Sequence, residues 1–307
     1  MKKNVFYLSA ALAVLFLTVA LTGYAAETTQ EETKAPVEKK GILVASFGTS
    51  YAETRKVTIE ACEDKIRDSF PEYEVRRAFT SSIIRKIMQE RDHIQVDSVE
   101  EALTKMKQAG FTEVIVQPLH IIPGVEYNEV LDMVAGFKDD FASLVVGRPI
   151  LTTIEDYDKA VAALKTQIQE PWLDDETEAV VFMGHGTHHP ANASYACLQL
   201  KIWQSMPNVF IGTVEGYPAL DDIIPLLKEK GIKRISLMPY MVVAGDHAQN
   251  DMAGDEEDSW KSILKEEGFY VNTYLQGLGE NAAYQQMYVD NIQDCIAGHP
   301  LGQHEEE

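Results

Sequence analysis

Short apolar runs alternate with stretches of helical periodicity along most of this chain. The apolar runs are rich in valine, isoleucine and leucine, as is typical of strands that are buried on both faces. Their alternation with amphipathic segments indicates parallel sheets with helices on both faces. The predicted strands are Gly41–Ser46, Val75–Phe79, Glu113–Leu119, Leu144–Gly147, Ala179–Met183, Val209–Val214, Arg234–Met238 and Tyr270–Tyr274. The segments between them predict helices, among them Glu53–Phe70, Glu126–Phe141 and Glu256–Glu267.

The pattern is interrupted once, between Pro171 and Thr177, where proline, tryptophan and acidic residues replace the apolar period. We place a domain boundary there. It gives an N-terminal α/β domain over residues 41–172 and a C-terminal α/β domain over residues 173–298. The sequence therefore predicts two doubly wound parallel-sheet domains.

Two segments suggest that the domains arose by internal duplication. The segment QPLHIIPGVE, which ends at Glu126, matches MPYMVVAGDH, which ends at His247, in its proline and in its glycine. A second pair, FGT and HGT, follows the first strand of each domain, and HGT begins at His185. Loops at the carboxyl ends of parallel strands are where open α/β sheets bind ligands. We therefore expect these loops to line a cleft between the two domains.

Two histidines are the first candidates for chemistry. His185 lies between two glycines directly after a predicted strand, where the backbone can turn sharply and a ligand can approach closely. His247 follows Asp246, whose carboxylate we expect to orient the imidazole, in the way that metal-bound histidines are usually held. The alternative is that Asp246 caps the next helix and that His247 is merely exposed. His188 and His189 are weaker candidates, because the next helix begins there.

Two carboxylates complete the candidate site. Glu126 occupies the position that matches His247, and Glu215 follows the second strand of the C-terminal domain. Imidazole and carboxylate ligands together suit divalent cobalt, nickel, iron or zinc. The alternatives for Glu215 are a favourable charge at a helix N-terminus or a salt bridge. The sequence contains no Walker loop and no GxGxxG, GxSxG or CxxC motif, so we expect no nucleotide cofactor.

The two ends of the chain differ from the rest. Lys2 and Lys3 precede an uncharged apolar run that ends in small residues, which is typical of a secretory signal peptide over residues 1–25. An uncleaved membrane anchor is the alternative. Residues 26–40 predict a disordered acidic tether, and residues 299–307 a frayed acidic tail. We therefore expect an exported protein, periplasmic or otherwise extracytoplasmic, with no stable membrane insertion after cleavage.

The chain is strongly acidic, with a formal net charge of −21 at pH 7. Cleavage of the signal peptide would remove Lys2 and Lys3 and make the charge more negative. Such a surface repels nucleic acid, so we expect no nucleic-acid partner. It also attracts cations, although solubility alone is the simpler explanation. The 3 cysteines are an odd number and predict no disulfide framework.

Eight blocks together resemble the anaerobic cobalt chelatases of the CbiK type. They occur in order between Gly41 and Ile296, as SFGTS (46–50), RAFTS (77–81), MGHG (183–186), YAC (195–197), AGDHA (244–248), NDMA (250–253), DSWK (258–261) and GLGEN (277–281). The resemblance implies a two-domain chelatase fold akin to ferrochelatase. It also implies an enzyme that inserts Co²⁺, and Fe²⁺ as an alternative, into sirohydrochlorin with release of two protons, a step of cobalamin biosynthesis. Co²⁺ then enters as the substrate metal ion.

The resemblance also implies a role for each candidate residue. His185, Glu215 and His247 correspond to the metal ligands, and Glu126 is a further acidic residue of the cleft. A neutral imidazole has a pKa near 6.5 and can either bind a metal or accept a proton. We therefore expect His185 and His247 to deliver the metal and to accept protons, as catalytic residues together with Glu126.

Some questions stay open at the level of sequence. The substrate carries carboxylates, for which Arg55 and Arg85 are the candidate partners. The alternative function is an exported carrier of a metal or of a tetrapyrrole such as haem, which reuses the chelatase fold. The physiological metal is undetermined, as is the oligomeric state, with a homo-oligomer among the alternatives.

Overall fold

The computed structural model describes residues 38–168, 173 and 175–302. The predicted signal peptide lies outside these residues, as do residues 26–37 of the predicted tether and residues 303–307 of the tail. The predicted domain boundary also falls beside residues that are not described. Within the described part of the chain, no helix is long and apolar enough to cross a membrane.

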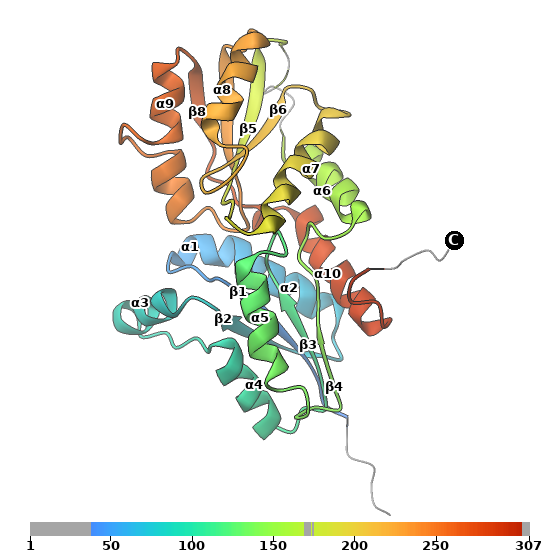
Figure 1. The fold of residues 1–307 in the computed structure, drawn as a ribbon. Helices are drawn as coiled ribbons and strands as arrows, with labels where there is room; N and C mark the ends of the chain where they lie inside the picture. The colour runs from blue at the N-terminus through green and yellow to red at the C-terminus, as the bar shows by residue number, and fades with distance from the viewer. Residues whose placement is uncertain (1–37, 169–172, 174, 303–307) are drawn as a thin grey trace, which may run out of the picture. The chain divides into compact units, whose positions relative to one another are not determined.

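Two parallel sheets of four strands each form the core of the fold (Figure 1). The first has the order β2-β1-β3-β4 and the second the order β6-β5-β7-β8, so the same topology is built twice. This repetition confirms the predicted duplicated α/β fold. The strands are β1 (Lys40–Ser46), β2 (Glu74–Phe79), β3 (Glu113–Pro118), β4 (Ser143–Val146), β5 (Glu178–Gly184), β6 (Val209–Thr213), β7 (Arg234–Tyr240) and β8 (Tyr270–Thr273).

The central strands are buried on both faces, as their apolar runs predict. In β1, Ile42 and Val44 belong to one apolar core, whereas Leu43 and Ala45 belong to another. Because successive side chains of a strand point to opposite faces, these cores lie on the two sides of the sheet. The helices are α1 (Ala52–Arg55), α2 (Ala61–Ser69), α3 (Ser82–Asp92), α4 (Val99–Gln108), α5 (Val125–Ala135), α6 (Ile154–Gln167), α7 (Ala193–Trp203), α8 (Leu220–Glu229), α9 (Trp260–Glu266) and α10 (Ala282–Ile296).

Three predicted helices differ from those observed. The predicted helix Glu53–Phe70 is divided into α1, a π-helical turn (Lys56–Glu60) and α2. The helix that was predicted to reach Phe141 ends at Ala135. Helix α9 begins at Trp260 rather than at Glu256, because the hydroxyl of Ser259 accepts a hydrogen bond from the backbone of Ser262 and caps the helix there.

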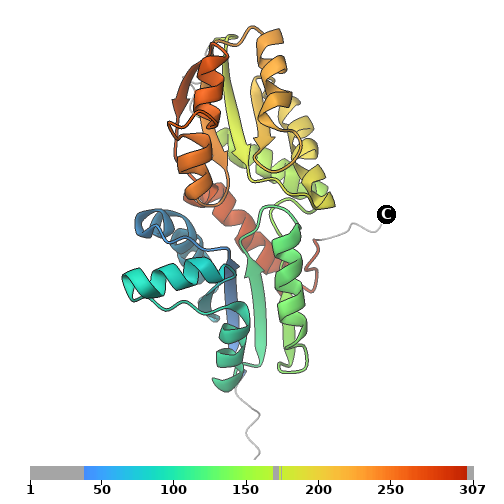
Figure 2. The ribbon, with the colours of Figure 1, turned by 60° about the vertical axis from the view of Figure 1, so that its left-hand side comes forward.

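Each half of the chain sends one helix to the other half. Helix α6 follows the first sheet in sequence but packs against α7 of the second half. Helix α10 follows the second sheet but packs against α2 and β3 of the first half, which is visible in both ribbon views (Figures 1 and 2). The hydroxyl of Tyr284 on α10 donates to the carbonyl of Ala160 on α6 at 3.1 Å. The two exchanged helices therefore also contact each other.

A buried arginine holds the start of α6 to α10. Arg148 is 2% exposed and lies between β4 and α6. Its Nε and Nη2 atoms donate to the carboxylate of Asp156 at 3.0 and 3.1 Å. Its Nη1 atom lies 2.8 Å from the carboxylate of Asp294 on α10. Asp156 also caps α6 by accepting from the backbone of Thr153. One guanidinium thus joins both exchanged helices.

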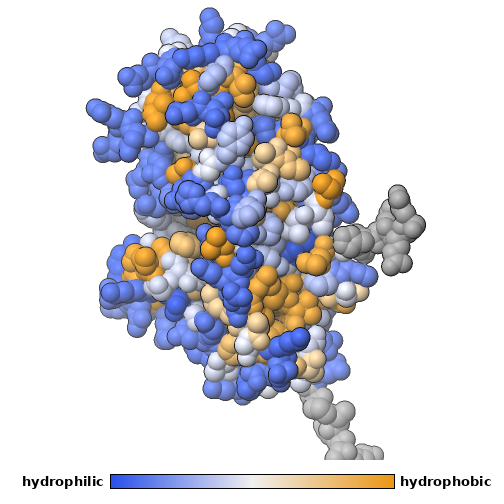
Figure 3. All heavy atoms as spheres, in the orientation of Figure 1, coloured by the Kyte–Doolittle hydropathy of each residue, from blue (hydrophilic) through white to orange (hydrophobic). Residues whose placement is uncertain are grey.

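Hydrophilic side chains cover much of the face shown in Figure 3, and apolar side chains gather in separate patches between them. This surface agrees with the acidic composition and the net charge of −21.

Candidate functional site

The loops that follow the central strands of the two sheets meet around one cavity of about 410 Å³. Its walls include residues 46–49 at the end of β1 and residues 119–122 after β3 in the first half. In the second half, residues 185–186 after β5 and residues 241–243 and 245–247 after β7 contribute. The carboxyl ends of β1, β3, β5 and β7 therefore face a common space, as the duplicated loops predict.

His185 and His247 lie next to each other in this cavity. Their ring centroids are 4.8 Å apart, and their planes are nearly perpendicular at 87°. The Nδ1 atom of His185 lies 2.9 Å from the carbonyl oxygen of Gly186, and that of His247 lies 2.5 Å from a carboxylate oxygen of Asp251. An acceptor at Nδ1 favours the tautomer in which Nε2 carries the lone pair. Both histidines are thus oriented as metal-binding histidines usually are.

Asp251, and not Asp246, holds the imidazole of His247. Asp246 instead accepts a hydrogen bond from the side chain of Asn250 at 2.9 Å. The π-helical turn Ala248–Met252 follows His247 directly and places Asp251 beside its ring. The prediction that Asp246 orients His247 was therefore wrong, because the neighbour in sequence is not the neighbour in space.

Gly186 allows the backbone to turn directly after His185. Its φ is +78°, a left-handed conformation that side chains other than glycine rarely adopt. A Cβ atom at this position would lie 2.6 Å from the carbonyl oxygen of Glu215. The glycine of the HGT sequence is therefore required both by its conformation and by the close approach of the next loop.

The two candidate carboxylates are placed differently. Glu126 lies in the first turn of α5 and lines the cavity together with both histidines. Glu215 is exposed and is not part of the cavity wall, although its backbone N–H donates to the carbonyl of His185 at 2.8 Å. No three histidine, cysteine, aspartate or glutamate side chains of the described residues come together as a metal site. His185, His247 and Glu126 therefore line the same cavity. The metal-binding role of Glu215 stays a prediction.

The neighbouring histidines have other roles. The Nδ1 atom of His189 accepts from the backbone of Ala191 at 3.2 Å and caps the short helical turn Pro190–Asn192. Its Nε2 atom lies 3.3 Å from the side chain amide of Asn128 on α5. His188 is exposed and does not line the cavity. His189 thus caps the helix start at which the sequence placed it, and it does not line the cavity.

The structure adds a third histidine that the sequence analysis did not select. His120 follows β3 and lines the same cavity. Burial lowers the pKa of its imidazole to about 4, an effect that the carboxylate of Glu126 partly opposes. His120 lies within the duplicated segment QPLHIIPGVE, at the position that matches Met241, which also lines the cavity. That position was the one signal in the sequence that pointed to it.

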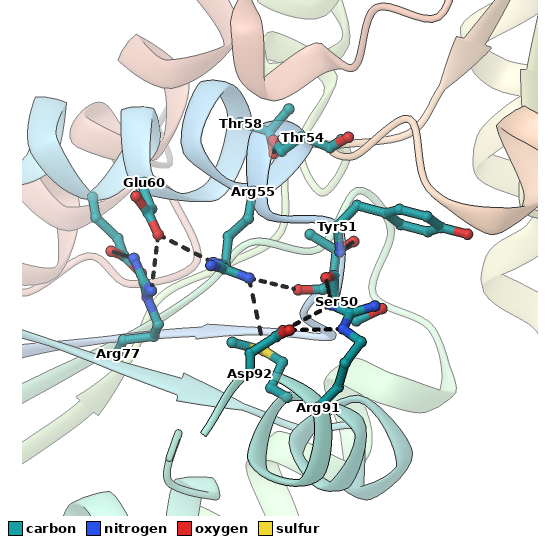
Figure 4. A network of polar contacts seen from close by, with 12 residues as sticks. Ser50, Tyr51, Thr54, Arg55, Thr58, Glu60, Arg77, Arg91 and Asp92 are labelled. Carbon is teal, nitrogen blue, oxygen red and sulfur yellow. Dashed lines mark hydrogen bonds and ion pairs between the residues drawn. The ribbon is translucent and has the colours of Figure 1, made fainter. Parts of the chain in front are cut away.

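Arg55 supports the loop after β1 and does not reach the cavity (Figure 4). Its side chain is buried, with Nε donating to Glu60 at 3.1 Å and Nη1 to the carbonyl of Thr49 at 3.4 Å. Glu60 also pairs with Arg77 at 3.2 Å. Arg85 lies in a separate polar pocket, 3.4 Å from Glu101. The predicted contact of Arg55 and Arg85 with substrate carboxylates is thus not supported.

Comparison with known proteins identifies the family. The family model for cobalt chelatase (CbiK) matches residues 40–297. The chain belongs to the CbiK family. It is 42% identical over 258 residues to a sirohydrochlorin cobaltochelatase of Salmonella typhimurium, which covers 84% of this chain and 97% of that protein. It is 40% identical over 264 residues to the sirohydrochlorin cobaltochelatase CbiKC of Nitratidesulfovibrio vulgaris, which covers 85% of this chain and 92% of that protein.

Solved structures confirm the chelatase fold of this CbiK family member. SirB from Bacillus subtilis has a TM-score of 0.62 at 15% identity, covering 85% of this chain and 96% of SirB. CbiX, described as the terminal enzyme of siroheme biosynthesis in denitrifying bacteria, has a TM-score of 0.51 at 14% identity, covering 83% of this chain and 98% of CbiX. At these identities the likeness concerns the fold alone. Since the curated relatives are cobaltochelatases, the alternative of an exported carrier protein is not favoured.

Proposed function

We propose that this chain is a sirohydrochlorin cobaltochelatase, which exchanges two pyrrole protons of its substrate for one Co²⁺ ion. The observation that carries the proposal is the pair His185 and His247, whose rings lie 4.8 Å apart in a cavity shared by both halves. The cobaltochelatases of Salmonella typhimurium and Nitratidesulfovibrio vulgaris support the choice of metal and of tetrapyrrole.

The donor set suits a metal that must be released. Two neutral imidazoles leave most coordination positions of Co²⁺ free for water and then for the nitrogens of the macrocycle. Such a site holds the ion more weakly than a complete set of four to six ligands would. Its carboxylate neighbour, Glu126, offsets positive charge in the cavity. We also propose that the side chain of Glu215 turns towards His185 as a third ligand during delivery, since its backbone is already bonded to that residue.

The reaction itself provides the test of this function. The protein that begins after residue 25 is mixed with metal-free sirohydrochlorin and Co²⁺ in the absence of oxygen, and the absorption spectrum is followed. We expect cobalt insertion well above the uncatalysed rate. We expect Fe²⁺ to be inserted too, because nitrogen and oxygen ligands discriminate poorly among divalent metals of this row. Insertion of Co²⁺ no faster than without protein would refute the proposal.

We further propose that the enzyme works outside the cytoplasm, in the periplasm or an equivalent compartment. The support is the sequence of residues 1–25, with its two lysines, its apolar run and its small residues. The match to the cobalt chelatase family begins at residue 40 and therefore does not include this segment.

Expression of the full chain tests the export proposal. In a bacterial host, we expect the protein in the periplasmic fraction, with an intact mass that lacks residues 1–25. The same chain with Lys2 and Lys3 replaced by glutamate is the control, because the positive residues before the apolar run promote export. Full-length protein found only in the cytoplasm would count against the proposal.

A further inference from the structure

Among the described residues, the imidazole of His120 has no hydrogen-bond partner. Both ring nitrogens are buried, and neither contacts a donor or acceptor among the residues that the structure describes. Folded proteins pair most of their buried polar atoms, because an unpaired one destabilises the fold. Two unpaired atoms on one ring, in the wall of the active-site cavity, therefore call for a partner that binds there.

The ring is unprotonated near neutral pH and can therefore receive a proton. Burial lowers its pKa to about 4, so His120 is neutral near pH 7 and one of its nitrogens carries a lone pair. Among the described residues, Glu126 is the charged group that acts against this shift and stabilises the protonated ring. The positive charge of a protonated His120 is thus stabilised by this carboxylate, which is partly exposed.

His120 and the metal-binding pair come from different halves of the chain. His120 and Glu126 follow β3 in the first half, whereas His185 and His247 follow β5 and β7 in the second half. A flat macrocycle held between the two halves presents one face to each wall. This arrangement separates the approaching dication from the departing protons, which would repel each other on the same face.

We propose that His120 is a catalytic residue that accepts a pyrrole proton on the face of the macrocycle opposite to His185 and His247; this inference rests on the proposed cobalt insertion. The pyrrole N–H bond breaks and an N–H bond forms at the imidazole. The electron pair left on the pyrrole nitrogen binds Co²⁺. The imidazolium then releases its proton to solvent, while the charge of Glu126 stabilises the protonated ring until it does, and the neutral ring can take the second proton.

Replacement of His120 by phenylalanine separates a catalytic role from a structural one. The ring volume is kept and both unpaired nitrogens are removed, so we expect the Tm to rise by about 2 to 4 °C. We expect Co²⁺ alone to bind as in the wild type, measured by the cobalt absorption bands. We expect kcat for insertion to fall about 100-fold or more, as is usual when a general base is lost.

Two further variants serve as comparisons. His120→Gln keeps a hydrogen-bond acceptor but cannot take up a proton, so its KM for sirohydrochlorin should stay near the wild-type value while kcat falls as for His120→Phe. Tyr288→Phe removes another buried and unpartnered polar atom, on α10 and outside the cavity. It should raise the Tm without changing kcat.

The outcomes are distinct. Wild-type kcat in His120→Phe would overturn the inference, as would a lowered Tm with activity lost only in proportion to unfolded protein. Wild-type kcat in His120→Gln would show that hydrogen bonding suffices, and would also overturn proton acceptance. If the wild-type protein itself inserts no cobalt, the proposed function fails and this inference fails with it, whatever the variants do.

Discussion

Replacement of His185 or His247 by alanine is expected to reduce kcat for cobalt insertion by more than about 100-fold, because the loss of a second-shell partner alone costs 10- to 100-fold in metal sites. Each histidine supplies one of the two imidazoles that converge in the cavity. The remaining ring would bind Co²⁺ through a single protein ligand. We expect both variants to fold normally, since both rings are partly exposed. Steady-state rates and titration with Co²⁺ measure the two effects separately.

Asp251→Asn is expected to have a smaller effect on metal binding than the loss of either histidine. Its carboxylate holds His247 through Nδ1 at 2.5 Å, so its loss should weaken Co²⁺ binding by about 10- to 100-fold while leaving both imidazoles in place. Asp255→Asn is the matched control, because Asp255 is 99% exposed and pairs with Lys261. Unchanged turnover in both histidine variants would refute the site. If Asp255→Asn weakened Co²⁺ binding as much as Asp251→Asn, the net charge of the protein, and not the contact of Asp251 with His247, would control metal binding.

Arg148→Met should lower the free energy of unfolding by about 3 to 5 kcal/mol, which is the usual cost of removing one partner from a buried ion pair. Asp156 and Asp294 would lose their common counter-charge, and Asp156 is 1% exposed. Unfolding by urea, with the midpoint and slope both measured, gives the value. We expect one cooperative transition in the wild type, because Arg148 joins helices of both halves.

An exposed ion pair gives the control for this measurement. Arg67 pairs with Asp64 on the surface of α2, where its side chain is 50% exposed. Arg67→Met should therefore cost less than about 1 kcal/mol. Equal effects of the two substitutions would contradict the view that Arg148 stabilises the exchanged helices.

The sheets could be predicted from the sequence because their signal is local. Strands such as β1 consist of apolar residues that enter cores on both faces, so the run itself reveals the strand. The exchange of α6 and α10 could not be predicted in the same way. Apolar periodicity shows which face of a helix is buried, but not which sheet or helix covers it. The ends of α5 and α9 depended on turns and caps, which outweigh weak propensities.

The candidate site was predictable where backbone geometry determined it. His185 was recognised by its two glycines, and Gly186 indeed adopts a positive φ. The partner of His247 was misjudged because a π-helical turn brings Asp251 to the ring. Arg55 was misjudged because its burial depends on residues that are distant in sequence. His120 was overlooked since the absence of a partner is a property of packing, which no motif records.

The position of α10 has a consequence for the order in which the molecule can fold. The ribosome makes α10 after every other helix that the structure describes, yet Tyr284, Tyr288 and Ile292 of this helix lie in the same core as Ile42 and Val44 of the first strand. While the chain is being made, the first sheet therefore lacks part of its cover. Its core can close only after α10 has emerged. Such late completion would leave the nascent chain without a finished N-terminal half until α10 has been made, so the first sheet depends for its stability on residues more than two hundred positions further along the sequence.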